Sequence, residues 1–184
     1  MSAGRLTPPV SERDHVAGPA DAPITLVEYG DYECPHCGRA YPIVKAVQRS
    51  LGSQLRFVFR NFPLTEAHPH AEHAAEAAEA AGAQGKLWEM HDVIFENQDA
   101  LEDADLVQYA ESLGLDADRV ARDLAAEVWA KRVREDFRSG VRSGVNGTPT
   151  FFLNGIRYDG EWWNEESFIG DLRYAADRPR EGVA

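Results

Sequence analysis

Residues 31–38 read DYECPHCG and contain the only two cysteines of the 184-residue chain, Cys34 and Cys37. An apolar run rich in β-branched residues, ITLVEY at 24–29, ends just before them and predicts a buried strand. No third cysteine is present, so the partner of each cysteine is expected to be the other. A spacing of two residues lets the first turn of a helix bring both sulfurs within bonding distance. The stretch therefore predicts a redox pair where a strand passes into a helix.

The order of the two cysteines predicts their roles. Cys34 is expected to attack as the thiolate, because unpaired N–H groups and the helix dipole stabilise negative charge at a helix N-terminus. Cys37 is expected to resolve the mixed disulfide that results. Pro35 suits the first helical position, and His36 can donate a hydrogen bond or bring positive charge close to the Cys34 sulfur. A stabilised thiolate favours the reduced protein, so the disulfide form is predicted to be an oxidant.

A pair of cysteines with this spacing can also be half of a zinc site, which needs two more nitrogen or sulfur ligands. Only histidines could supply them, and His68, His70 and His73 cluster along the chain. Because only some of these three can share one helix face, we interpret them as surface or capping residues. No metal site and no bound cofactor are expected.

The composition is that of an ordinary globular protein, with 43% hydrophobic and 27% charged residues. The length predicts one domain, or one domain with an insertion. A formal net charge of −12 argues against nucleic acid or an anionic membrane as a partner. Residues 1–10 lack the apolar stretch of a secretory signal, which predicts a cytoplasmic protein; a leader removed from the chain would make it periplasmic or extracytoplasmic. We expect a monomer.

Local patterns predict a mixed sheet flanked by helices. Residues 1–20 are expected to form a mobile arm, with regular structure starting near Pro23. Helical spacing follows the cysteines to residue 51, a second strand covers 55–62, and helices fill 66–144. Within that block we expect Asp103 and Asp116 as N-caps, the latter for one long helix reaching Val141. Strands at 150–153 and 156–158 flank Asn154-Gly155, a type I′ hairpin signal, before a last helix at 165–176.

Several of these segments resemble the DsbA-like branch of the thioredoxin superfamily. They are DYECPHCG at 31–38, NFPL at 61–64, an alanine-rich segment at 71–81, QGKLWEMH at 84–91 and VNGTPTFFLNG at 145–155. The resemblance covers roughly residues 15–177. It implies a thioredoxin fold of the α/β class, whose sheet is mixed as in α+β proteins. Residues 21–64 and 145–178 would form the thioredoxin-like domain, and 65–144 an inserted helical subdomain.

The resemblance also implies further site residues. Pro149 would be cis and lie beside the cysteines, where the neighbouring backbone can pair with an extended substrate segment, and Thr148 would face the sulfurs. Glu28 matches a buried acid whose raised pKa would let it exchange a proton with Cys37. Some relatives pair this acid with a lysine on the next strand. Phe57 stands at that place here, and whether Arg56 or Arg60 pairs with Glu28 instead stays open.

The expected function is thiol-disulfide exchange with protein or peptide substrates through a Cys34/Cys37 dithiol-disulfide cycle. The cycle would be biased toward oxidation and would need a redox partner that the sequence does not identify. Two other functions stay open at this point. One is a chaperone module that binds peptides beside Pro149, and the other is a metal-binding protein that uses Cys34, Cys37 and a histidine.

Overall fold

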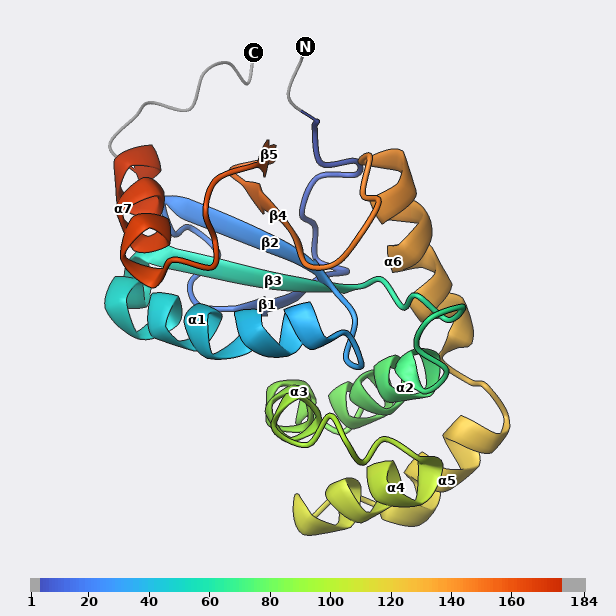
Figure 1. Ribbon diagram of the computed structural model, residues 1–184. Coiled ribbons are helices and arrows are strands. Elements are labelled where there is room, and N and C mark those ends of the chain that lie inside the picture. Colours follow the sequence, from blue (N-terminus) through green and yellow to red (C-terminus); the bar gives the residue numbers. More distant parts are fainter. Residues whose placement is uncertain (1–3, 177–184) are drawn as a thin grey trace.

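A five-stranded mixed sheet forms the centre of the protein (Figure 1), in a computed structural model that describes residues 4–176. The strands lie in the order β1-β3-β2-β4-β5. The central pair, β2 (Ile24–Gly30) and β3 (Leu55–Asn61), is parallel. The remaining strands run antiparallel to their neighbours in the sheet, and these strands are β1 (His15–Ala17), β4 (Thr150–Leu153) and β5 (Ile156–Tyr158). The predicted mixed sheet is therefore confirmed.

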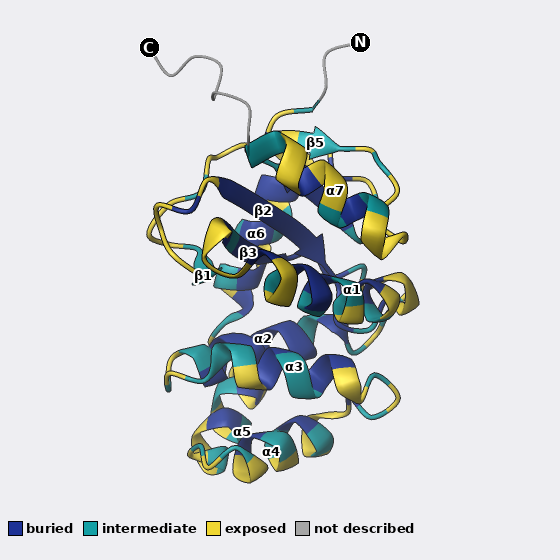
Figure 2. Ribbon diagram, turned by 90° about the vertical axis from the view of Figure 1, so that its left-hand side faces the viewer, coloured by how far each residue is buried: buried dark blue, intermediate teal, exposed yellow. Residues whose placement is uncertain are grey.

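Helices cover both faces of the sheet, which explains why β2 is buried along its whole length (Figure 2). On one face lie α1 (Pro35–Leu51) and α7 (Glu165–Ala176), which pack on alternate residues such as Leu26. On the other face α6 (Ala130–Arg142) packs on the residues between them, such as Val27. A strand buried on both faces reads as a continuous apolar run rather than an alternating one.

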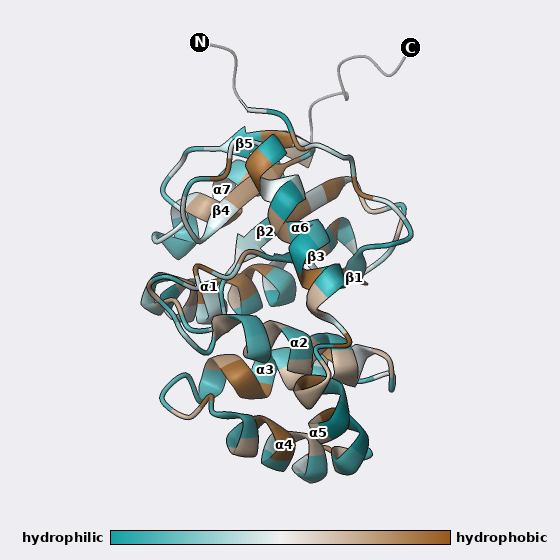
Figure 3. Cartoon of the chain, turned by 90° about the vertical axis from the view of Figure 1, so that its right-hand side faces the viewer, coloured by the Kyte–Doolittle hydropathy of each residue, from teal (hydrophilic) through white to brown (hydrophobic). Residues whose placement is uncertain are grey.

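Four helices lie beyond α1, away from the sheet (Figure 1). The nearer pair is α2 (Ala71–Gly82) and α3 (Leu87–Glu96), and the farther pair is α4 (Asp103–Ser112) and α5 (Ala117–Ala125). The expected insertion, 65–144, also includes α6. That helix nevertheless contacts β3, and its Phe137 stacks on Phe62 with ring centroids 4.3 Å apart. The helices that lie away from the sheet are therefore α2 to α5. The outward side of α6 is hydrophilic (Figure 3).

Two predictions for the helical block are wrong. The long helix expected from Asp116 to Val141 is two helices, α5 and α6, because the chain turns between them at Glu127, whose φ is +49°. Val128, expected on its apolar stripe, is 52% exposed. Asp116 does cap α5, accepting from the N–H of Arg119 at 2.8 Å. The cap of α4, however, is Glu102 rather than Asp103.

The hairpin between β4 and β5 has the predicted turn. Asn154 and Gly155 both adopt positive φ, +49° and +84°, as a type I′ turn requires. The Asn154 side chain also reaches the neighbouring strand, where its Oδ1 accepts from the N–H of Thr25 at 2.8 Å. The turn residues thus fix the position of β4 beside β2.

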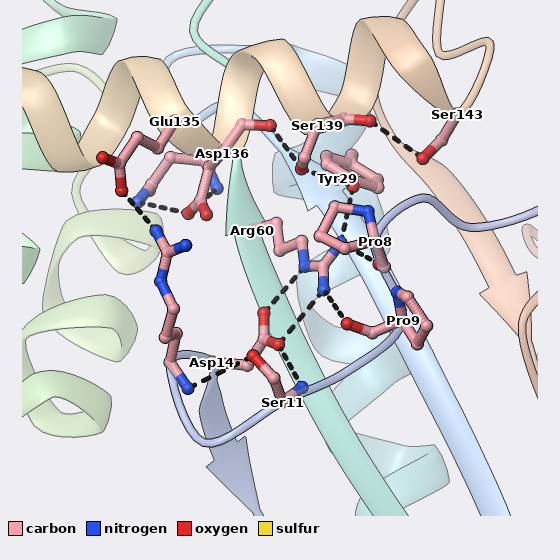
Figure 4. Close-up of polar contacts among 12 residues, drawn as sticks. Pro8, Pro9, Ser11, Asp14, Tyr29, Arg60, Glu135, Asp136, Ser139 and Ser143 are labelled. Carbon is pink, nitrogen blue, oxygen red and sulfur yellow. Dashed lines mark hydrogen bonds and ion pairs between the residues drawn. The ribbon is translucent and has the colours of Figure 1, made fainter.

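The N-terminal segment differs from the expected arm, because regular structure begins before Pro23. β1 adds to the edge of β3, and Asp14 just before it forms an ion pair with Arg60 at 2.7 Å (Figure 4). The Arg60 guanidinium also donates to the carbonyl groups of Pro8 and Pro9. A three-residue strand is too short to show a pattern in the sequence, and its polar anchor lies 46 residues away. Both described ends of the chain lie above the sheet in Figure 1, on the side away from α4 and α5.

Candidate active site

The two cysteines lie where β2 passes into α1. Cys34 is the N-cap residue of α1, in extended conformation, and Pro35 opens the helix. This is the strand-to-helix junction that the sequence predicts. Both cysteines are free thiols, and Cys34 is 4% exposed whereas Cys37 is fully buried. An incoming sulfur would therefore meet Cys34.

The surroundings of the two thiols separate their acidities. The pKa of Cys34 is lowered to about 5, chiefly by a hydrogen bond from Cys37, against the opposing effect of burial. The side chain of Thr148 and the backbone N–H groups of Cys37 and His36 lower it further. The pKa of Cys37 is raised well above that of a free thiol, first by burial and then by its hydrogen bond to Cys34. Near neutral pH the pair thus holds one thiolate, on Cys34, and one proton, on Cys37.

The Thr148-Pro149 segment lies against the Cys34 sulfur, as the family resemblance implied. The peptide bond between these two residues is cis. The Cys34 thiol donates to the Thr148 carbonyl oxygen at 3.5 Å. The Thr148 hydroxyl is buried and has no hydrogen-bond partner among the described residues. An ionised Cys34 would supply the acceptor that this hydroxyl lacks.

Glu28 is buried on the α1 side of the sheet, with 3% of its surface exposed. Burial, and next the negative charge of Cys34, raise its pKa to about 8, so its carboxyl group keeps a proton at neutral pH. It also borders a cavity of about 240 Å³ lined by residues of α1 and α3. The position beneath the cysteine pair that the resemblance implies is consistent with both observations.

Neither arginine proposed as a partner of Glu28 pairs with it. Arg60 binds Asp14, and Arg56 donates to the Thr25 hydroxyl and to the Ala20 carbonyl. The reason is the two-residue period of a strand. Glu28 is paired in register with Phe59, and its side chain shares a face with that residue, whereas Arg56 and Arg60 lie on the opposite face of β3.

His36 is exposed at the start of α1, and its ring contacts the guanidinium of Arg39 through Nδ1. A guanidinium only donates, so this nitrogen accepts and carries no proton in that contact. The part of His36 that lowers the pKa of Cys34 is its backbone N–H. A role for its side chain stays a prediction.

Sequence reasoning missed Asp31, whose carboxylate organises the turn before α1. Its Oδ1 accepts from the N–H groups of Glu33 at 2.8 Å and Cys34 at 3.1 Å. Its Oδ2 accepts from the N–H of Leu64 and from Nδ1 of His68, both at 2.8 Å. An acid directly after a strand and three residues before a helix cap is typical of such turns, and this signal was available in the sequence.

Gln98, after α3, was also missed. Its amide nitrogen donates to the carbonyl groups of Tyr32 at 2.8 Å and Cys34 at 3.0 Å. Gly38 lies under the same side chain, and a Cβ at this position would be 2.0 Å from the Gln98 Oε1 atom. The inserted helices therefore support the cysteine turn from outside, and only glycine leaves room for that support.

The three clustered histidines face three different carboxylates. His68 contacts Asp31, His70 contacts Glu33 at 2.9 Å, and His73 contacts Asp103 at 2.6 Å. Across residues 4–176, no three histidine, cysteine, aspartate or glutamate side chains converge in a way that could hold a metal ion. Within the same range, no helix combines the length and apolar character needed to cross a membrane.

Comparison with known proteins gives relatives in sequence. The model of a family described as thioredoxin matches residues 10–167. The chain is 50% identical over 157 residues to a protein of Salinispora arenicola named Na(+)/H(+) antiporter NhaA 1, an alignment that covers 85% of this chain and 24% of that protein. The chain thus spans about a quarter of the length of the curated relatives it matches.

Solved structures are similar over nearly the whole chain. Oxidised BdbD from Bacillus subtilis has a TM-score of 0.84 at 23% identity, covering 96% of this chain and 98% of that one. A thioredoxin-like oxidoreductase from Silicibacter pomeroyi has a TM-score of 0.78 at 28% identity, covering 94% and 95%. The alpha-DsbA1 protein of Wolbachia pipientis has a TM-score of 0.74 at 19% identity, covering 91% and 94%.

The family model covers most of the chain, and the solved structures share its overall fold. They confirm the fold and the resemblance predicted from residues 31–38 and 145–155. The chain belongs to the thioredoxin family and has the fold of its DsbA-like members.

Proposed function

We propose that the chain is a thiol-disulfide oxidoreductase that exchanges disulfides with protein or peptide thiols through Cys34 and Cys37, with a bias toward oxidation. One observation carries the proposal, namely that the pKa of Cys34 is lowered to about 5 while that of its neighbour Cys37 is raised. This is the division of acidity that an attacking and a resolving thiol need. Similarity to the thioredoxin-like oxidoreductase from Silicibacter pomeroyi supports it.

Oxidation of a substrate would proceed in two exchanges. A substrate thiolate attacks Cys34 Sγ in the Cys34–Cys37 disulfide, that bond breaks, and Cys37 leaves with the electron pair and takes up a proton. A second substrate thiolate then attacks the substrate sulfur of the mixed disulfide and displaces Cys34 as a thiolate. The substrate loses two electrons and gains a disulfide, and the enzyme becomes the dithiol.

Glu28 would serve the proton step at Cys37. Its pKa of about 8 means that it can donate and accept a proton close to neutral pH. Cys37 itself is fully buried, so a proton cannot reach it directly from bulk water. The cavity beside Glu28 offers water a place from which to exchange that proton.

The oxidising bias follows from thiolate stability. A leaving group of low pKa departs faster and is more stable as product, so an enzyme with a stabilised Cys34 thiolate gives up its disulfide readily. Thr148 and cis-Pro149 lie beside this sulfur, where the Thr148 backbone could pair with a substrate segment. Substrate binding there, and a contribution from the His36 side chain, are parts of the proposal.

The cycle needs no bound cofactor, but a separate redox partner must reoxidise Cys34 and Cys37. We propose that the protein works as a monomer. An oxidising role fits an extracytoplasmic compartment better than the cytoplasmic one expected from residues 1–10, because cytoplasmic thiols are kept reduced. Sodium-proton exchange belongs to the names of relatives of which this chain covers a quarter, and it is not part of the proposal.

The test is the equilibrium of the purified protein with glutathione, together with oxidation of a reduced model protein. We expect a reduction potential well above about −270 mV, the value typical of thioredoxin. A potential near that value would contradict the bias but leave disulfide exchange intact. The double variant Cys34→Ser, Cys37→Ser should lose all exchange. A chaperone would keep its activity in that variant, and a metal carrier would instead retain stoichiometric zinc or copper on the reduced wild-type protein.

A further inference from the structure

We infer that His68 is a positioning residue for Cys34, and that its positive charge offsets the negative charge of buried Asp31 in the turn that carries the reactive sulfur. The inference rests on the proposed exchange chemistry of Cys34. It assigns a function to the residues after β3, which reach the cysteine turn from the start of the inserted helices.

The Asp31 carboxylate is wholly buried, with 0% of its side chain exposed. A buried carboxylate is unfavourable unless hydrogen bonds or opposite charge compensate it. Asp31 receives backbone hydrogen bonds from Glu33, Cys34 and Leu64, and its fourth donor is the His68 ring. Within residues 4–176, His68 is therefore the only ionisable donor to this carboxylate.

The position of Asp31 creates an electrostatic conflict with Cys34. The carboxylate accepts the N–H of Cys34 itself, and the backbone N–H of Asp31 donates to Cys37 Sγ at 3.4 Å. A negative charge this close to a second one opposes ionisation of the thiol. A protonated His68 offsets the charge of the Asp31 carboxylate, so that this carboxylate no longer opposes ionisation of Cys34.

The groups around His68 favour its charged form. Burial alone would lower its pKa, but the hydrogen bond to Asp31 and the negative charges of Asp31, Cys34 and Glu33 raise it above the ordinary value. The influence of the Cys34 charge on His68 is reciprocal, because two charges affect each other equally. The same positive charge that Cys34 stabilises must therefore stabilise the Cys34 thiolate.

The other histidines of the cluster do not have this geometry. His70 binds Glu33 with its side chain 43% exposed, where solvent screens the charge. His73 of α2 binds Asp103 of α4 and serves as a matched control, since it too donates to an aspartate from Nδ1.

The test compares three single variants of the reduced protein. His68→Asn keeps a donor near the Nδ1 position but removes the charge, His68→Lys keeps a charge but changes the donor, and His73→Asn controls for the substitution itself. The ultraviolet absorbance of the thiolate against pH reports ionisation of Cys34, and Cys34→Ser identifies the signal. Equilibration with glutathione reports the redox equilibrium.

We expect His68→Asn to raise the pKa of Cys34 and to weaken the oxidised protein as an oxidant by about threefold or more. His68→Lys should stay within about a factor of two of wild type, and His73→Asn should not differ from it. Circular dichroism checks that each variant folds. If His68→Asn should not fold, titration of His68→Lys against wild type still tests whether a cation alone suffices.

Two results would overturn the inference. One is a pKa of Cys34 in His68→Asn that equals the wild-type value. The other is an equal change in that pKa in His68→Asn and His68→Lys, which would assign the effect to packing. The thiolate titration needs no substrate. A wild-type protein that ionises as described but exchanges no disulfides would therefore contradict the proposed function while leaving this inference standing.

Discussion

The Sγ atom of Cys34 lies 3.5 Å from the carbonyl oxygen of Thr148, a residue 114 positions further along the chain. The contact joins the first turn of α1 to the segment that enters β4, and the two parts meet because β4 runs beside β2. The Cys34 sulfur is therefore surrounded both by its own helix turn and by the backbone of a segment distant in sequence. Its acidity depends on both, which makes the acidity a sensitive test of the site.

The rate at which Cys34 is alkylated should follow its ionisation. Because the pKa of Cys34 is lowered to about 5, the rate with iodoacetamide should rise through pH 5 and be constant from about pH 6.5 upward. A free cysteine would instead reach its half-maximal alkylation rate at about pH 8.5. Mass spectrometry of the quenched protein measures the rate at each pH. A midpoint at the pH of a free thiol would contradict the account of the site.

Replacing Cys37 should change the acidity of Cys34, because the hydrogen bond from Cys37 is the largest cause of the lowered pKa. In Cys37→Ala the pKa of Cys34 should rise by about one unit or more, and in Cys37→Ser, which keeps a hydroxyl donor, it should rise less. The same alkylation profile measures both. Equal profiles for the alanine variant and the wild type would mean that the helix N-terminus alone stabilises the thiolate.

Glu28→Gln should separate the two halves of disulfide exchange. The glutamine cannot transfer a proton, so attack by Cys34 on a substrate disulfide should be unchanged while resolution by Cys37 slows by about a hundredfold. The mixed disulfide should then accumulate and be visible after acid quenching. If Cys37 resolves the mixed disulfide at the wild-type rate in this variant, Glu28 does not transfer the proton.

The same substitution should alter the pH dependence of stability. Folding raises the pKa of Glu28 from 4.5 to about 8, so the folded protein holds this proton over a range in which the unfolded chain has lost it. Its contribution to stability is fully present below about pH 4.5 and is lost as the pH rises to about 8, a difference of up to roughly 4 kcal/mol. In Glu28→Gln this loss of stability with rising pH should be absent.

Urea unfolding of the reduced protein at the two ends of that pH range measures the difference. The gain of Glu28→Gln over wild type should be small near pH 4.5 and largest near pH 8. Glu66→Gln, a substitution at an exposed turn residue, is the control and should show no such trend. A parallel shift at both pH values would mean that packing, not ionisation, explains the effect.

The N-terminal segment should contribute strongly to stability through one ion pair. Asp14 and Arg60 have side chains 5% and 3% exposed, so Asp14→Ala leaves a buried guanidinium without its carboxylate and should lower the free energy of unfolding by about 3–5 kcal/mol. Glu135→Ala breaks the exposed pair between Glu135 and Arg13. This variant should change the free energy of unfolding by less than about 1 kcal/mol. Similar losses in the two variants, measured by urea unfolding, would contradict this difference.

The parts of the fold that the sequence predicted are those encoded in contiguous residues. ITLVEY is apolar throughout because β2 is covered on both faces, and Asn154-Gly155 adopts the positive φ angles that its residue types favour. The cysteine motif fixed the start of α1 because Pro35 suits a first helical turn. Each of these signals is local, and each was confirmed.

The parts that could not be predicted depend on contacts between distant residues. Asp31 organises the turn only because Leu64 and His68 reach it from the end of β3. The break between α5 and α6 lies within an unbroken helical pattern, since α6 must turn away to cover the sheet. The partner of Glu28 was left open, although the strand period places Arg56 and Arg60 on the other face and could have excluded both.

The first described segment and the end of α7 both lie above the sheet in Figure 1, whereas the start of α1 faces the helices below it. A carrier protein or a solid support joined directly to either of these two described segments would therefore be held away from the reactive sulfur. Tethered versions of this protein should keep the thiol accessible to large clients, and the choice of attachment point can be made for convenience of expression.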